Sequence, residues 1–332
     1  MAMMILREAD ARFTARSKMK IAVIGYGNQG RAHALNLRDA HFELAIGQRP
    51  GESAQRARRD GFSPRPVADA AARSDLIILT LPDESAAEVY EQYIAPVLHA
   101  GQTLAFVHGF NIRFGFITPA DGVDIIMVAP KGPGTLLRSL YEEGKGLPAL
   151  MAIERDATGG ARDTALTWAS GIGALRAGVV ETTFAEETET DLFGEQVVLC
   201  GGVTALTKAA FETLVEAGYA PEFAYLECVH ELKQVVDLLY ERGLSGMRER
   251  ISNTAEYGDL TRGPRIVTEQ TRQEMGRILE EIRSGAFAKE WIQEYRSGGK
   301  KFAKLHQADT DTAYEHAGRA VRSLMPWLGD EA

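Results

Sequence analysis

The sequence contains only two cysteines, Cys200 and Cys228, among its 332 residues, and neither belongs to a Cys-x-x-Cys pair. Two isolated thiols cannot build a disulfide framework, so we expect a reducing, cytoplasmic setting. No uninterrupted apolar run reaches the ~18 residues of a membrane-spanning helix. The N-terminal residues also lack the apolar stretch and cleavage site of a secretory signal, and we interpret them as a short leader into the first strand. No membrane contact is expected.

Basic residues are outnumbered by acidic ones: 37 Lys and Arg stand against 46 Asp and Glu, which gives a formal net charge of −9. Proteins that bind nucleic acid usually carry a basic excess, so this class of partner is not expected. The carboxylates are instead available to bind a cation. The 45% hydrophobic and 25% charged residues are typical of a globular protein, and the length predicts about two domains.

The first half of the chain alternates apolar runs with stretches of helical spacing, such as Arg31–Asp39, Ser85–Ile94 and Gly160–Ala169. Seven runs rich in Val, Ile and Leu are predicted strands, and the lack of polar residues within them predicts a sheet covered on both faces. These runs are Lys20–Gly25, Phe42–Gly47, Leu76–Leu81, Thr103–Val107, Asp124–Ala129, Pro148–Ile153 and Leu175–Val180. The alternation predicts a parallel, doubly wound α/β domain over residues 1–182.

Apolar runs of the strand type almost disappear after Thr182, and long stretches with a 3.6-residue period take their place. These stretches are Phe193–Ala217, Pro221–Arg242, Arg272–Ser284, Ala286–Arg296 and Thr312–Leu328. Glycines such as Gly218 and Gly243 separate them. We therefore predict an all-helical second domain over residues 183–328.

A glycine-rich motif lies between the run Lys20–Gly25 and the helix that follows it. In KIAVIGYGNQGRAHALNL, Gly25, Gly27 and Gly30 form a G-x-G-x-x-G pattern. Such glycines allow a tight turn and a close approach of the backbone to a pyrophosphate, while the helix N-terminus supplies N–H donors. Between a strand and a helix, the motif predicts a dinucleotide site rather than a turn without a ligand.

The loop after the second predicted strand, in IGQRPGESAQRARRDG, gives a mixed indication of the nicotinamide cofactor. Arg49 is suited to hold a 2′-phosphate through charge-assisted hydrogen bonds. Glu52 would repel that phosphate and would accept hydrogen bonds from free ribose hydroxyls. We interpret the three following arginines as a solvated helical face, namely Arg56, Arg58 and Arg59.

Two ionisable residues follow predicted strands, where ligands approach an open α/β sheet. His108 ends the strand in LAFVHGF, and Lys131 lies in the Pro/Gly-rich loop of IIMVAPKGPG. Considered alone, the histidine is as often structural as functional, and a loop lysine is usually exposed to solvent.

Two pairs of carboxylates are each four residues apart: Asp191 and Glu195 in ETETDLFGEQVVLCGG, and Glu227 and Glu231 in AYLECVHELKQVV. This spacing places both members of a pair on one helix face, where like charges repel unless a cation compensates them. Two such pairs among apolar neighbours predict an all-oxygen site suited to Mg²⁺, with two solvated acidic faces as the alternative. A solvated acidic face is expected for three nearby glutamates, Glu186, Glu187 and Glu189.

Together these motifs resemble those of ketol-acid reductoisomerase, in the short bacterial (class I) form of this branched-chain amino-acid enzyme. The resemblance extends from about Lys20 to Trp327. It rests on the motifs GYGNQG, HGFNI, VAPKGPG, ETETDLFGEQVVLCGG, AYLECVHELK and ISNTAEYGD. It implies a Rossmann-like N-terminal domain, a knotted helical C-terminal domain, and dimers whose helical domains intertwine.

The resemblance also implies roles for individual residues. Two Mg²⁺ ions are expected on Asp191, Glu195, Glu227 and Glu231. The expected catalytic residues are His108, Lys131 and Glu231, and Ser252 of ISNTAEYGD is expected to contact the substrate. Cofactor contacts are expected from Gly25, Tyr26, Gly27, Asn28, Gln29, Gly30, Arg49, Glu52, Asp83, Glu84, Ser85, Ala86 and Gly134. In similar enzymes the Glu227/Glu231 helix and Ser252 reach the active site from the partner subunit, so a homodimer or higher homo-oligomer is expected.

The implied activity is Mg²⁺-dependent alkyl migration and NAD(P)H reduction of 2-acetolactate or 2-aceto-2-hydroxybutyrate to the 2,3-dihydroxy acid, in valine and isoleucine biosynthesis. Two other functions stay open. A dehydrogenase of a 2-keto or hydroxy acid would reduce its substrate without Mg²⁺-dependent rearrangement, and a non-catalytic dinucleotide-binding protein would bind the cofactor without turnover. The carboxylate quartet together with His108 and Lys131 argues against both.

Some positions depart from the family pattern. The family usually has Ser where this chain has Asn28, and His where it has Thr135. The phosphate-binding hydroxyls expected near positions 52 and 54 are replaced by Glu52 and Ala54. These changes disfavour a 2′-phosphate, since one charged hydrogen bond contributes ~1.5–3 kcal/mol. NADH is therefore the expected cofactor, with NADPH as the alternative.

Overall fold

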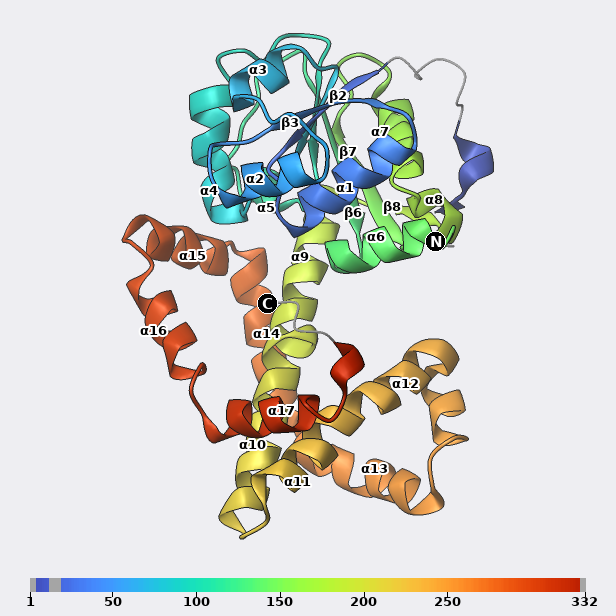
Figure 1. Cartoon of the computed structure of the whole chain (residues 1–332), viewed down its shortest axis with the longest axis vertical. Coiled ribbons are helices and arrows are strands. Elements are labelled where there is room, and N and C mark those ends of the chain that lie inside the picture. The colour runs from blue at the N-terminus through green and yellow to red at the C-terminus, as the bar shows by residue number, and fades with distance from the viewer. Residues whose placement is uncertain (1–3, 12–18, 329–332) are drawn as a thin grey trace. The chain divides into compact units, whose positions relative to one another are not determined.

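The computed structural model describes residues 4–11 and 19–328. The chain forms two compact units, Met1–Thr190 and Asp191–Ala332. The first unit is an α/β sheet structure and the second is helical (Figure 1), so the predicted fold class is confirmed. The two units meet within helix α9 (Phe184–Gly194), and the boundary predicted from sequence falls just before this helix.

Within the described residues, the first unit is built on one eight-stranded sheet with the order β1-β8-β7-β6-β5-β4-β2-β3. Its strands are β1 (Ile5–Leu6), β2 (Lys20–Ile24), β3 (Glu43–Gly47), β4 (Leu76–Leu79), β5 (Thr103–Phe106), β6 (Asp124–Pro130), β7 (Ala149–Arg155) and β8 (Val179–Glu181). Strands β2 to β6 are parallel, as predicted. Strand β7 is antiparallel to β6, and β1 is antiparallel to β8, so the prediction of a wholly parallel sheet is wrong.

The reversal at β7 follows from the connection that precedes it. Pro130 at the end of β6 pairs with Ala149 at the start of β7, so the chain leaves and re-enters the sheet at the same edge. A parallel strand needs a crossover that carries the chain back to the opposite edge. Helix α6 (Gly134–Glu142) packs along α1 (Asn28–Asp39) and does not provide that crossover.

Two further sequence predictions in this unit are wrong. The run Leu175–Val180 is not one strand, because its first residues form helix α8 (Ala174–Ala177) and β8 begins only at Val179. In sequence the run resembles a strand because Leu175, Val179 and Val180 are apolar, although Leu175 belongs to the helix and only the valines to the strand. The N-terminal segment is also more than a leader, since Ile5 pairs with Val180 in the sheet; residues 1–3 and 12–18 lie outside the described residues.

Helices cover both faces of the sheet, as the apolar strands predict (Figure 1). In β2, Ile21 and Val23 belong to one apolar layer with α1 and with α7 (Ala161–Gly171). Ala22 and Ile24 belong to the other layer, with α3 (Val67–Ala72) and α4 (Asp83–Val89). The remaining helical segments of this unit are η1 (Glu8–Asp10), α2 (Glu52–Arg59), η3 (Tyr90–Ile94) and α5 (Phe110–Arg113). This packing fixes the sheet and leaves its carboxyl edge to the loops.

The described part of the second unit contains helices and no strand. Its elements are η4 (Glu195–Leu199), α10 (Gly201–Glu216), α11 (Pro221–Tyr225), η5 (Leu226–His230), α12 (Glu231–Arg248), α13 (Asn253–Ile266), α14 (Glu269–Arg283), α15 (Ala286–Arg296), α16 (Lys300–Ala308), α17 (Ala313–Arg322) and η6 (Pro326–Leu328). The backbone leaves helical geometry at Gly243, where the sequence predicts a break. Helices α13 and α16 were not predicted. The knotted path implied by the resemblance stays a prediction.

Two wide π-helical turns occur at the predicted metal ligands. The N–H of Cys200 donates to the carbonyl of Glu195, and the N–H of Glu231 donates to the carbonyl of Leu226, both across five residues. A Cβ at Gly202 would clash with the carbonyl of Val197, so the wide turn requires a glycine there. The assumption that both carboxylate pairs sit on regular α-helices is therefore wrong. Such π turns are frequent at functional sites.

Much of the apolar surface of the second unit is exposed, including 86% of Tyr240 and 67% of Leu199. The continuous helical stretch Phe184–Glu216 has 33 residues, and its most apolar 18-residue window has a mean hydropathy of 1.4 and is 11% buried. By length and composition alone this stretch could cross a membrane, a property that the search for uninterrupted apolar runs did not reveal. Core helices of soluble proteins have the same composition.

Candidate active site

The loops predicted to carry the chemistry all follow parallel strands of the first unit. The glycine motif follows β2, helix α4 follows β4, His108 follows β5 and Lys131 follows β6. Because β2, β4, β5 and β6 are parallel neighbours, these segments share the carboxyl edge of the sheet, where ligands bind in open α/β folds.

The glycine motif has the shape that a dinucleotide pyrophosphate requires. A Cβ at Gly30 would clash with the carbonyl of Gly25, whereas a Cβ at Gly27 would meet nothing within 4 Å. Helix α1 begins directly after Gly27, and no side chain caps it, so its first N–H groups are available to an anion. The Oε1 atom of Gln29 is buried and has no hydrogen-bond partner among the described residues. These residues fit the cofactor.

A second helix N-terminus lies against the first. Helix α6 begins at Gly134, after Pro133, and it also lacks a side-chain cap. A Cβ at Gly134 would clash with the carbonyl of Asn28, and Gln29 Nε2 donates to the carbonyl of Gly132 at 2.9 Å. Gly134, a predicted cofactor residue, thus allows the two helix ends to approach each other.

The other predicted cofactor residues at this edge differ in what they can offer. The Tyr26 side chain is buried and donates to Asp60 at 2.9 Å, and its burial and this hydrogen bond raise the pKa of the phenol. Only its backbone is left to face a ligand. The first turn of α4 contains Asp83, Glu84, Ser85 and Ala86, of which Ala86 is buried in the core and Ser85 Oγ donates to the carbonyl of Pro82.

A buried carboxylate joins the ends of β5 and β6. Glu187 Oε1 accepts a hydrogen bond from Lys131 Nζ at 2.7 Å and lies 3.2 Å from His108 Nδ1. Its Oε2 accepts from the backbone N–H of Gly109 at 3.1 Å. The Glu187 side chain is 1% exposed, so the expectation that it belongs to a solvated acidic face is wrong.

The charge of this carboxylate is set by its two partners. Burial alone would raise the pKa of Glu187, but the hydrogen bond and charge of His108, with the charge of Lys131, outweigh it and lower the pKa to about 2. Glu187 is therefore ionised at neutral pH. It holds two nitrogen-bearing side chains from separate strands in fixed positions.

The helix pattern contains a signal that would have identified Glu187. Phe184 is buried and packs edge-to-face on Phe106 at 6.1 Å, and Thr188, four residues later, is also buried. This spacing places Glu187 on the face of α9 that packs against the sheet. Sequence reasoning considered only the spacing of the acidic residues. Of the other two glutamates, Glu189 pairs with Arg113 at 2.7 Å, and Glu186 is exposed.

The predicted metal ligands lie in the second unit. Asp191 is half-buried, one turn beyond Glu187 along α9, and the other three, Glu195, Glu227 and Glu231, are exposed. Four carboxylates are the hard oxygen donors that Mg²⁺ prefers. Within the described part of this unit, however, no three of them lie close enough together in one copy to hold a single ion. The four carboxylates are therefore suitable ligands for Mg²⁺, but the described residues of one copy do not bring three of them together.

Ser252, the predicted substrate contact, is the N-cap residue of α13. Its Oγ accepts a hydrogen bond from the backbone N–H of Ala255 at 3.2 Å, and the residue is exposed. The hydroxyl hydrogen is not used by this cap, so it is available to a ligand.

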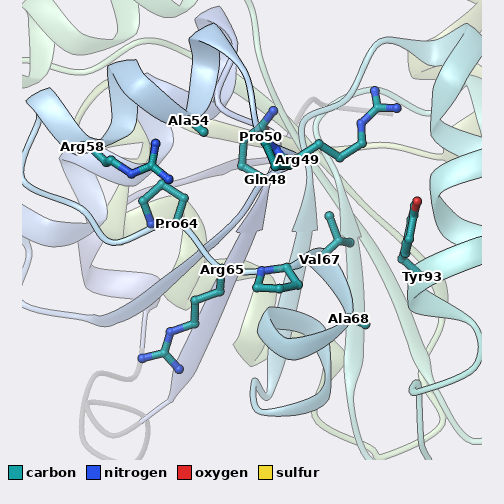
Figure 2. A pocket seen from close by; sticks show the side chains of 11 residues that line it. Gln48, Arg49, Pro50, Ala54, Arg58, Pro64, Arg65, Val67, Ala68 and Tyr93 are labelled. Atoms are coloured by element: carbon teal, nitrogen blue, oxygen red, sulfur yellow. The ribbon is translucent and has the colours of Figure 1, made fainter.

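A cavity of about 300 Å³ lies beyond the end of β3, beside α2 (Figure 2). It is lined by Gln48, Arg49, Pro50, Ala54, Arg58, Pro64, Arg65, Pro66, Val67, Ala68 and Tyr93. Glu52 does not line it: its side chain is 80% exposed and lies 3.4 Å from Arg56. Arg58, interpreted from sequence as part of a solvated face, does line it.

Comparison with known proteins agrees with this arrangement. The family described as acetohydroxy acid isomeroreductase, NADPH-binding domain, matches residues 16–178, and ketol-acid reductoisomerase, C-terminal domain, matches residues 184–327. A solved structure of an NADH-preferring ketol-acid reductoisomerase from an uncultured archean is 42% identical, with a TM-score of 0.95 over 97% of this chain and 99% of that one.

More distant structures share only the fold. A semialdehyde dehydrogenase NAD-binding protein from Cupriavidus necator is 18% identical, with a TM-score of 0.63 over 80% of this chain and 99% of its own. The two family matches together cover nearly the whole chain, from the nucleotide-binding sheet to the last helices. The chain therefore belongs to the ketol-acid reductoisomerase family, oxidoreductases of branched-chain amino-acid biosynthesis that use NAD(P)H.

Proposed function

We propose that this enzyme catalyses Mg²⁺-dependent alkyl migration in 2-acetolactate or 2-aceto-2-hydroxybutyrate, followed by reduction to the 2,3-dihydroxy acid. The observation that carries the proposal is the Lys131–Glu187–His108 cluster at the carboxyl edge of the sheet. Asp191 follows one turn later on the same helix as Glu187. In this proposal Lys131 and His108 face the substrate, and the nearby Asp191 binds the metal.

The residues of the proposed site have distinct roles in this mechanism. Asp191, Glu195, Glu227 and Glu231 would hold Mg²⁺, which would supply Lewis-acid polarisation of the substrate ketone and a lower pKa of the adjacent hydroxyl. Glu231 and its surrounding water accept the hydroxyl proton that starts the migration. Lys131 and His108, fixed by Glu187, hold the water and protons around the substrate oxygens. The N–H groups of α1 bind the cofactor so that the nicotinamide faces this edge.

Each active site is proposed to take residues from two copies of the chain. Among the described residues of one copy no three of the four carboxylates gather at one point, and the helical unit exposes large apolar side chains such as Leu206 and Phe223. Exposed apolar surface of this kind is typical of an obligate interface. We infer that a second copy covers it, and that Glu227, Glu231 and Ser252 complete the site of the first.

NADH is the proposed cofactor. Helix α2 has no hydroxyl at positions 52 and 54, where the resemblance implies phosphate-binding residues, and Ala54 lines the cavity beside this helix. The similarity to an NADH-preferring enzyme supports the same preference. We place the enzyme in the cytoplasm, which agrees with two free cysteines.

The experiment is the steady-state kcat/KM on 2-acetolactate with saturating Mg²⁺, measured in parallel with NADH and NADPH. Turnover that disappears with a chelator is expected. Reduction of 2-keto acids without conversion of 2-acetolactate would favour the simple dehydrogenase. Cofactor binding without any turnover would favour the dinucleotide-binding protein, and a strong NADPH preference would overturn the choice of NADH.

A further inference from the structure

Helix α2 separates its charged side chains onto two faces. Glu52 and Arg56, four residues apart, form an exposed pair at 3.4 Å. Ala54 and Arg58, also four residues apart, both line the 300 Å³ cavity beside the end of β3. A spacing of four places each pair on one helix face. The acidic residue of this helix is therefore paired outside the cavity, and a basic residue lines it.

In the described part of the chain, the guanidinium groups around this cavity have no anionic partner. Across residues 4–11 and 19–328, the side chains of Arg49 and Arg58 make no hydrogen bond or ion pair. In Figure 2 the Arg58 side chain extends from α2 toward Pro64, while Arg49 extends on the side of Tyr93. Arg65 also lines the cavity, but its side chain points away from both. Two uncompensated cations beside one hollow favour an anionic ligand group.

We propose that Arg58 is a specificity-determining residue, which binds the phosphate on the adenosine ribose of NADPH and so keeps that cofactor usable. This inference rests on the proposed function, because it takes the cavity as the adenosine end of the nicotinamide site. The loss of hydroxyls at positions 52 and 54 favours NADH, and Arg58 opposes that preference from the next turn of the same helix. Glu52 contributes little, because Arg56 neutralises it outside the cavity.

The helix itself supplies a matched control. Arg59 is the next residue, is exposed, and does not line the cavity, so Arg59→Gln removes the same charge from the same helix. If Arg58 contacts the phosphate directly, only its replacement should weaken NADP⁺ binding. If only the overall positive charge of α2 matters, replacement of Arg58 and of Arg59 should have equal effects. Arg58→Lys tests whether a charge without the planar fork is sufficient.

The test measures binding of NADP⁺ and NAD⁺ by isothermal titration calorimetry, without substrate or Mg²⁺, to the wild-type protein and each variant. Arg58→Gln is expected to weaken NADP⁺ binding about ten- to hundredfold and to change NAD⁺ binding less than about twofold. Arg59→Gln is expected to change neither by more than about twofold, and Arg58→Lys to give an intermediate NADP⁺ affinity.

Several results would overturn the inference. These are an unchanged NADP⁺ affinity in Arg58→Gln, an equal loss of both dinucleotides, or an equal effect of Arg59→Gln. Far-ultraviolet circular dichroism and thermal unfolding of each variant show whether an equal loss comes from misfolding; if so, Arg58→Lys carries the comparison. Since no turnover is measured, a failure to convert 2-acetolactate would overturn the proposed function and leave this binding result intact.

Discussion

The Nζ atom of Lys131 lies 2.7 Å from Oε1 of Glu187, whose side chain is 1% exposed. The same oxygen lies 3.2 Å from Nδ1 of His108. A buried carboxylate is stable only with such partners, and here it is the partner that the two side chains share. The cluster is therefore a single charged unit rather than three independent side chains.

Replacing Glu187 is expected to disable this unit. Glu187→Gln removes the negative charge that Lys131 and His108 share. Breaking a buried ion pair in this way lowers the free energy of unfolding by about 3–5 kcal/mol. We expect kcat/KM on 2-acetolactate to fall by about 100-fold or more. The exposed neighbour Glu186 provides the control, and Glu186→Gln is expected to keep nearly full activity. A Glu187→Gln enzyme within threefold of wild type would contradict the assigned role.

Replacing either of two glycines in the nucleotide motif by alanine is expected to have a different effect. A Cβ at Gly27 meets no atom within 4 Å, so Gly27→Ala is expected to fold normally and to bind NADH about tenfold or more weakly, because the methyl group occupies the pyrophosphate approach. A Cβ at Gly30 clashes with the carbonyl of Gly25, so Gly30→Ala is expected to lower the unfolding temperature itself. Calorimetric NADH titration and thermal unfolding separate the two effects. Normal NADH affinity in Gly27→Ala would show that the cofactor does not approach this loop.

Shared active sites predict complementation between two inactive variants. Asp191→Asn and Glu231→Gln are each expected to be inactive as homodimers. When the two chains are co-expressed equally, half of the dimers are mixed, and each mixed dimer has one intact site of two, so about a quarter of wild-type activity returns. The measurement is the activity of the co-expressed mixture and of affinity-purified mixed dimers, which are expected to show about half of wild-type activity. Recovery would be absent if each site used residues from one chain only.

Acid stability is expected to depend on His33. The Trp168 indole N–H donates to His33 Nδ1 at 3.1 Å, so the ring hydrogen is on Nε2, which is buried without a partner among the described residues. Burial lowers the pKa of His33 from 6.5 to about 3. The unfolded chain therefore binds a proton below pH 6.5 that the folded protein refuses until about pH 3. Stability is full above the unfolded pKa and falls by about 1.4 kcal/mol per pH unit below it.

The check is urea unfolding of wild type and His33→Gln between pH 4.5 and pH 7. The glutamine keeps an acceptor for Trp168 but has no proton to gain, so its stability curve is expected to fall less steeply, by roughly 2.7 kcal/mol over two pH units below 6.5. Comparison of slopes removes the constant cost of the substitution. Parallel curves would show that another group controls acid unfolding.

The strands of the sheet were predictable from sequence because most are buried on both faces and are apolar except near their ends. The direction of each strand could not be predicted in the same way. The run that forms β7 has the same pattern in a parallel or an antiparallel strand, and its direction is decided by the edge at which the chain re-enters the sheet, beside Pro130. Helix α13 was missed because it has no buried residue and therefore no clear apolar period.

The site shows a similar division. The glycine loop, His108 and Lys131 follow strands, so their common edge could be inferred from the order of elements. The burial of Glu187 depends on a contact between α9 and the sheet, which the spacing of acidic residues does not reveal. The position of Arg58 depends on which face of α2 meets the cavity. Both facts belong to tertiary packing, and the sequence interpretation assigned both residues to solvent because each belongs to a group of like charges.

The loop between β6 and α6 cannot change its length without disturbing the site. Lys131 contacts Glu187, and Gly134, three residues later, touches the backbone of Asn28. An inserted or deleted residue here would shift the ammonium group relative to the nucleotide loop by up to ~3.5 Å, more than a hydrogen bond tolerates. Engineers who graft segments between related enzymes should therefore keep this loop at its present length.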